Sequence, residues 1–488
     1  MKIKLFPWAA TALALVSSMA SATDADNAET QKRLCQEVKC LKCQVAKLKK
    51  EEKKSKSQVF TVENKEVSHI DIPSAFYFGS TPILSAPYIG TQTMFNGSHL
   101  IVNIPSTNED LRLLRQQQKL FNTYLDNDIP YPKNPYVEFS GKIEGQVIES
   151  TPYTGNRTSD INLSGAELDM AAVLNPWAVS FLGFVYNSNP PSLNNPPITR
   201  TANSEVQLSK GFLSIGNFNK TPVYGTIGQF VVPFGLYASN MLTPTLTSTM
   251  GQLLERAISI GYSAGEQGPY GALFTFKGDS GSGGTLGHIN QVGLNIGYAH
   301  DFGTVKTDIG GGYIANIADS NGMQNNGQTS GFTGFGGSES SETLSHRVPA
   351  VDVRGGIAFG KYNFRAEYID SIRTFAPIDL SYNGFGARPS ALDVQGSYSF
   401  MTFAHPSAVA IGYGNSSEAL ALLIPKQRYS AAYNVAIWRH TIGTLEFHHD
   451  INYGTSDYAS GGGNLPVNTN NNLGHTSQTL TAQLGVYF

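Results

Sequence analysis

The feature that most constrains this chain is a repeated alternation of apolar and polar residues from residue 136 to the C-terminus. Val292, Leu294, Ile296 and Tyr298 form one such run, with small or polar residues between them. A period of two is that of a β-strand with one apolar face. Soluble β-sandwiches also contain such strands, so alternation alone leaves the class of β-protein open.

The connections between these segments alternate between short and long. Tight turns are expected at residues 175–176, 217–220, 301–303, near 360 and at 439–440, and long polar loops at 187–202, 320–345, 373–390 and 454–476. Outer-membrane barrels have this asymmetry, with short periplasmic turns and long outer loops. No apolar run after the first 22 residues is long enough for a membrane helix.

Charged residues stand on the polar face of the predicted strands, although they make up only 15% of the chain. Burying such groups in a dry core costs several kcal/mol each unless every one is paired. A water-filled lumen removes most of that cost. The predicted lumenal charge ladder consists of Lys306, Asp308, Asp352, Arg354, Arg365, Glu367, Arg428, Glu446 and Asp450.

The last segment of the chain ends on an aromatic residue. Its apolar face carries Leu480, Ala482, Leu484, Val486 and Phe488, a pattern similar to the signal that barrel-assembly machinery recognises. Bacterial barrels have an even number of strands because both ends face the periplasm. Counting residues 407–413 as a separate strand gives sixteen, with fourteen as the alternative. The predicted fold is therefore all-β, a transmembrane antiparallel barrel over residues 136–488, located in the bacterial outer membrane.

The N-terminal 58 residues differ from the rest. Residues 1–22 read as a signal peptide, with Lys2 and Lys4 before an apolar stretch and a small-residue cleavage site. Residues 23–58 are a basic segment, either a coiled coil that joins copies of the chain or a tether. Its heptad seam consists of Leu34, Val38, Leu41, Val45 and Leu48. The same segment holds the three cysteines, Cys35, Cys40 and Cys43, which lack a fourth metal ligand and whose redox state stays open.

Residues 59–135 form a small mixed module that is either periplasmic or a plug in the barrel mouth. Ser106 and Glu109 make a capping box that predicts a helix running to about Leu125. Pro130 and Pro132 end it.

The candidate sites each have two interpretations. Arg354, Arg365 and Arg428 are candidates to bind an anionic, carboxylate-rich chelate, or the ladder simply braces the barrel interior. Glu446, His448 and Asp450 share the lumenal face of one strand, whereas His449 faces lipid; we expect no metal and no cofactor there. The chain contains no G-x-S-x-G nucleophile motif, and we expect no enzyme activity.

Several stretches resemble the siderophore-porin family typified by the outer-membrane receptor for legiobactin, which is related to outer-membrane iron-uptake proteins of intracellular pathogens. These stretches are residues 137–145, 211–219, 222–235, 424–429 and 446–450. The resemblance implies uptake of a ferric siderophore without the usual energy-coupling box, and it defines no ligand-contact residues.

The expected partners are a ferric siderophore or another small anionic solute, outer-membrane lipids and the assembly machinery, but no nucleic acid. Two alternatives remain open: a general or anion-preferring nutrient porin with no iron role, and a structural or adhesive surface barrel.

Overall fold

The structure is a computed structural model that describes thirteen stretches of the chain. They are residues 76–78, 81–85, 92–96, 99–104, 107–126, 135–187, 205–265, 267–282, 288–325, 343–438, 440–461, 465–466 and 472–488. The predicted signal peptide, the heptad seam and the three cysteines lie outside the described residues.

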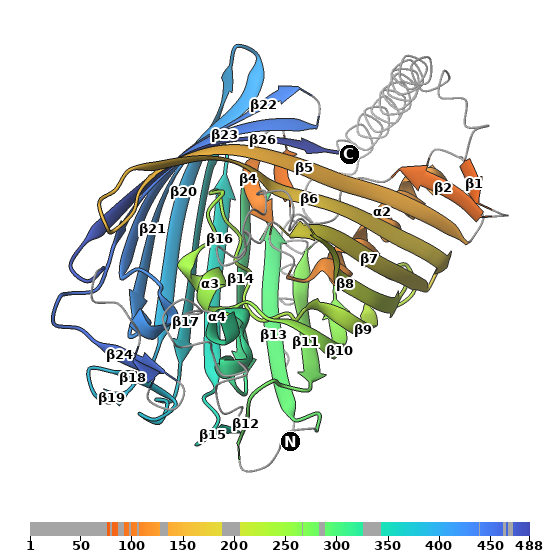
Figure 1. Cartoon of the computed structure of the whole chain (residues 1–488). Coiled ribbons are helices and arrows are strands. Elements are labelled where there is room, and N and C mark those ends of the chain that lie inside the picture. The colour runs from red at the N-terminus through yellow and green to blue at the C-terminus, as the bar shows by residue number, and fades with distance from the viewer. Residues whose placement is uncertain are drawn as a thin grey trace, which may run out of the picture. The chain divides into compact units, whose positions relative to one another are not determined.

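The fold is a closed antiparallel β-barrel of sixteen strands, as predicted (Figure 1). Neighbouring wall strands pair in chain order, and β26 pairs with β5 to close the barrel. The wall strands are β5 (Tyr136–Thr151), β6 (Thr158–Asn175), β7 (Ala178–Asn187), β8 (Glu205–Gly216), β9 (Val223–Val231), β10 (Leu254–Ser263), β11 (Gly268–Phe276), β13 (Gln291–Asp301), β14 (Val305–Ile314), β16 (Ala350–Phe359), β17 (Tyr362–Ser371), β20 (Ser390–Thr402), β21 (His405–Ser417), β22 (Gln427–Trp438), β23 (Thr441–Ile451) and β26 (Thr476–Tyr487). The extra strand that parity required is β21, and the five predicted tight turns all connect wall strands at one end of the barrel.

The two ends of the barrel sequence meet at Gly141 and Phe488. The backbone N–H of Gly141 donates to the carbonyl of Phe488 at 2.6 Å, and the N–H of Phe488 donates back at 2.9 Å. Phe488 is therefore fixed beside the first wall strand.

Apolar side chains cover the outside of the wall. Leu480, Leu484, Val486 and Phe488 of the C-terminal pattern are between 41% and 55% exposed. The alternate positions of the strands point inward and carry most of the buried charged groups. An apolar outer face over a closed barrel is the arrangement that lipid requires, because every wall strand is hydrogen-bonded to two neighbours.

Among the described residues that precede the barrel, the elements are two hairpins and a helix. Strands β1 (Phe76–Phe78) and β2 (Thr81–Ser85) pair with each other, and β2 also pairs in parallel with the start of β5. Strands β3 (Gln92–Asn96) and β4 (His99–Ile104) form the second hairpin. Helix α2 (Glu109–Asp126) follows, close to its predicted position.

Short elements also lie in the long loops. They are α3 (Leu246–Gly251), α4 (Asn321–Asn325), η1 (Ile317–Asp319), η2 (Leu420–Leu422), the β12 (Gly281–Ser282) and β15 (Thr343–Leu344) pair, and a small sheet of β18 (Leu380–Tyr382), β19 (Phe385–Gly386), β24 (Ala459–Gly461) and β25 (Leu465–Pro466). Among the described residues, none of the helices has the length and apolar content needed to cross a membrane.

Part of the lumen is filled by an apolar core. Phe181 and Phe212 stack with their ring centroids 5.1 Å apart, and Phe212 meets Phe230 edge-on at 5.9 Å. Leu113 of α2 and Phe234, from the loop after β9, belong to the same buried cluster. This cluster thus fills part of the lumen with side chains, and the remaining cavities are the place for a solute path.

Candidate lumenal site

The loop between β9 and β10 folds into the barrel and positions the site. We call residues 232–253, which include α3, the inward loop. It contains no Asp, Glu, Lys, Arg or His. Its core residues are fully buried, including Phe234 and Met250 at 0% exposure. No motif in the sequence indicates that this connection folds inward; its one visible signal is the absence of charged residues over 22 positions.

Wall side chains hold the inward loop by its backbone. The carboxylate of Glu367 on β17 accepts the N–H groups of Leu236 at 2.6 Å and Tyr237 at 2.9 Å. The amide oxygen of Gln395 on β20 accepts the N–H of Asn240 at 2.7 Å. These charge-assisted and amide bonds satisfy buried backbone donors that would otherwise cost about 1–3 kcal/mol each.

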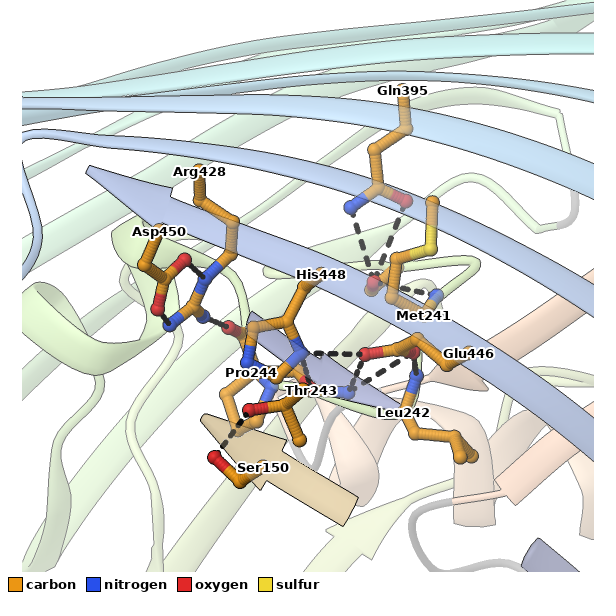
Figure 2. A network of polar contacts seen from close by, with 12 residues as sticks. Ser150, Met241, Leu242, Thr243, Pro244, Gln395, Arg428, Glu446, His448 and Asp450 are labelled. Carbon is orange, nitrogen blue, oxygen red and sulfur yellow. Dashed lines mark hydrogen bonds and ion pairs between the residues drawn. The ribbon is translucent and has the colours of Figure 1, made fainter. Parts of the chain in front are cut away.

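A second set of contacts holds the next part of the loop (Figure 2). Glu446 accepts the N–H of Leu242 and, at 3.2 Å, that of Thr243. Arg428 donates to the carbonyl of Pro244 at 3.1 Å and to both oxygens of Asp450 at 2.7 and 2.8 Å. Four predicted ladder residues therefore hold the loop: Glu367, Arg428 and Glu446 contact it directly, and Asp450 binds Arg428.

The remaining ladder residues lie on the neighbouring strands β14, β16 and β17. Asp352 forms an ion pair with Arg354, and the phenol of Tyr270 donates to Asp308 at 2.8 Å. The ammonium of Lys306 lies 3.6 Å from the carboxylate of Asp301, across the tight turn between β13 and β14. Arg365 donates to Asn363 at 3.3 Å.

These residues surround a cavity of about 510 Å³ that we call the charged cavity. Leu236 and Ala238 of the inward loop form one side of it. Its charged lining includes Lys306, Asp308, Arg354, Arg365, Glu367 and Asp393.

A second cavity of about 520 Å³, which we call the hydroxyl cavity, lies between the inward loop and strands β5, β6 and β26. Tyr237, Ser239 and Met241 line it, so alternate residues of the loop face the two cavities. Most of its other lining groups are hydroxyls and amides. They include Gln146, Ser164, Ser248, Gln252, Thr481 and Gln483.

Helix α2 contacts inward-facing residues of strands β8 and β9. The ammonium of Lys210 on β8 lies 3.2 Å from Glu109 and 3.5 Å from Glu167, and Thr226 on β9 donates to Asp110 at 2.8 Å. Burial raises the pKa of the Glu109 carboxyl, although Lys210 opposes this shift. The helix therefore lies inside the barrel wall and is held there by polar contacts.

His448 and His449 are consecutive residues of β23, so their side chains point to opposite faces of the wall. His448 faces the lumen, with its Nδ1 3.7 Å from Glu446 and 3.4 Å from the hydroxyl of Thr243. Asp450 is engaged by Arg428. Within the described stretches, no group of three or more His, Cys, Asp or Glu side chains is arranged to hold a metal.

Comparison with known proteins defines the family. No family model matches the chain. A UPF0422 protein of Legionella pneumophila (strain Lens) is 38% identical over 422 residues, covering 84% of this chain and 78% of that protein. A UPF0422 protein of Coxiella burnetii is 34% identical over 477 residues, covering 97% of each chain. The chain belongs to the UPF0422 family.

Solved structures similar to this chain are outer-membrane channels. An anion-selective porin from Comamonas acidovorans has a TM-score of 0.46 at 11% identity, covering 72% of this chain and 99% of that one. Salmonella typhi OmpF, in complex with daunomycin, has a TM-score of 0.48 at 11% identity, covering 74% and 99%.

The barrel's own geometry defines its class and location. A closed sixteen-stranded antiparallel barrel with an apolar outer face and a polar lumen is a porin-like channel of the bacterial outer membrane. This UPF0422 chain therefore has the architecture of a channel rather than that of an enzyme.

Proposed function

We propose that this channel selectively admits a ferric siderophore or a similar small anionic iron chelate, which binds in the charged cavity. The observation that carries the proposal is Arg365. Its guanidinium lines the cavity, and among the described residues no carboxylate lies within 4.0 Å of it. An arginine in this state has donors left for a carboxylate ligand.

The acidic groups around the cavity accept hydrogen bonds from other residues and occupy none of the N–H donors of this arginine. Glu367 accepts from the inward loop, and Asp393 accepts from Gln395 at 2.8 Å. Asp308 accepts from Tyr270. Protein walls have a low dielectric constant and concentrate electric field lines in the cavity. The field of an unpaired guanidinium is therefore stronger there than in bulk water.

The family resemblance of the sequence supports an iron chelate over other anions of the same size. The volume of about 510 Å³ is within the range of small-molecule sites. Because the cavity contains both signs of charge, we expect a ligand with carboxylates and polar groups rather than a simple inorganic anion.

The test measures uptake of a labelled ferric siderophore by iron-limited cells with the native gene, with a deletion, and with Arg365→Gln. We expect uptake to fall to background in the deletion and at least fivefold in the variant. Arg157→Gln is the matched control, because Arg157 forms an exposed ion pair with Glu149 in the first loop. Unchanged uptake in the deletion strain would remove the iron role.

Planar-bilayer recording distinguishes the general porin. We expect a small conductance that the ferric siderophore blocks, with weaker block in Arg365→Gln. A large conductance that the chelate does not affect would contradict selective binding and favour a nutrient porin.

A further inference from the structure

The hydroxyl cavity differs chemically from the charged cavity. Its lining is dominated by uncharged groups that both donate and accept hydrogen bonds, from β5, β6 and β26 on one side and the inward loop on the other. The inward loop contributes hydroxyls and amides but no charge. A solute that passes between this loop and the wall therefore meets mainly uncharged hydrogen-bonding groups.

The few charged groups at this cavity neutralise one another. Lys142 lies 3.1 Å from Glu144 and 4.0 Å from Glu167, and the phenol of Tyr487 donates to Glu144 at 2.9 Å. His448 is beside the carboxylate of Glu446. The lysine and the carboxylate that line this cavity are thus paired with each other.

We infer that the hydroxyl cavity is a binding site for neutral polyhydroxylated solutes, such as sugars and polyols. Sugar hydroxyls are donors and acceptors at once, and so are the side chains that line this cavity. Ile148, Met241 and Leu242 add apolar surface on which the C–H face of a sugar ring can rest. A volume of about 520 Å³ accommodates a small saccharide.

Two lining groups are the best probes of this site. Thr481 on β26 and Gln146 on β5 face the cavity, and no side-chain hydrogen bond of either residue occurs within the described part of the chain. Their hydrogen-bonding atoms are therefore available to a sugar, and removing them leaves the anchors of the inward loop intact.

The experiment uses the full-length protein in planar bilayers and records block of the KCl current by sucrose and maltose. Polyethylene glycol of matched hydrodynamic radius is the comparison solute. We expect the sugars to block at lower concentration than the polymer, and Thr481→Val with Gln146→Leu to weaken sugar block at least fivefold, because each lost hydrogen bond is worth about a fivefold change.

Two controls separate this site from folding defects and from the charged cavity. Thr307→Val makes the same substitution in the lining of the charged cavity and leaves sugar block unchanged. Arg365→Gln also leaves it unchanged, so failure of the siderophore proposal would not affect this result. Native heat-modifiable gel mobility establishes folding of the variants. Equal block by sugars and polymer, or no effect of the double variant, would overturn the inference.

Discussion

At the scale of single residues, Gly141 is fixed by the closure of the barrel. A Cβ atom there would lie 2.6 Å from the carbonyl oxygen of Glu167 and 2.8 Å from the ring of Phe488. Gly145, on the same strand, has no atom within 4 Å of an added Cβ. We expect Gly141→Ala to lower the free energy of unfolding by about 1–3 kcal/mol and Gly145→Ala to change it little. Urea unfolding in bilayers, followed by tryptophan fluorescence, measures both, and equal midpoints would contradict the close contact at the seam.

Glu446 holds the backbone of the inward loop at Leu242 and Thr243. It is 0% exposed, and its carboxylate accepts backbone N–H groups of Leu242 and Thr243. Glu446→Gln replaces one acceptor oxygen with an NH₂ group that faces those donors, and bonds to charged groups are worth about 1.5–3 kcal/mol. We expect a more mobile loop, seen as larger fluctuations of the single-channel current.

The control for this prediction is Glu149→Gln, which removes an exposed carboxylate paired with Arg157. Exposed pairs contribute about 0–1 kcal/mol. If Glu446→Gln and Glu149→Gln gave the same current noise as the native protein, the inward loop would be held by its apolar packing instead.

At the scale of elements, a buried cation links helix α2 to the wall. Lys210 contacts Glu109 of the helix and Glu167 of the wall, and Asp169 lies on the same inward face as Glu167. Lys210→Met leaves these carboxylates without their cation, a loss of about 3–5 kcal/mol. We expect the helix to leave the lumen, with a higher conductance and faster proteolysis at α2. Lys361→Met is the control, because Lys361 is exposed in the turn between β16 and β17 and lines neither cavity.

The stability of the fold is expected to depend on pH through Asp319, the last residue of the short helix η1. Burial raises the pKa of this carboxyl from 3.8 to about 6, although it accepts bonds from the N–H and hydroxyl of Ser280 at 2.8 and 2.6 Å. Because the pKa of Asp319 is higher in the folded state, the protonated carboxyl stabilises the fold. This stabilisation is fully present below pH 3.8, and it is lost as the pH rises through about 6, which lowers the free energy of unfolding by about 3 kcal/mol. We expect Asp319→Asn to remove this decline in urea-unfolding midpoints between pH 4 and 7. An unchanged slope would place the titration on another group.

The elements also show how far the sequence determines the structure. Alternation located the wall strands, and tight-turn residues such as Asn175 and Gly303 located the turns, because both signals depend on near neighbours in the chain. The inward loop was missed because its partners, Glu367 and Glu446, are more than a hundred residues away and on different strands. The pairing of Lys306 with Asp301 was missed for a related reason: register across a turn decides which charges meet.

At the scale of the whole molecule, the outer face of the barrel is the surface that meets lipid. Leu273, near the middle of β11, is 66% exposed, and Ile289, in the loop after β12, is 67% exposed. We expect Leu273→Arg to destabilise the folded barrel by about 2–4 kcal/mol and Ile289→Arg by about 0–1 kcal/mol, because an arginine is costly only at the depth of the hydrocarbon. Folding titrations in lipid vesicles measure the difference.

The pair Leu273→Arg and Ile289→Arg tests the membrane assignment itself, since the two side chains are equally exposed to solvent in a barrel without lipid. A water-surrounded barrel tolerates both arginines to the same extent. If Leu273→Arg destabilises the barrel more than Ile289→Arg does in vesicles, and the two cost the same without lipid, the difference comes from lipid around the middle of the wall. Two equal costs in vesicles would mean that β11 does not cross the bilayer, and the two cavities beside the inward loop would then not lie on a route across the membrane.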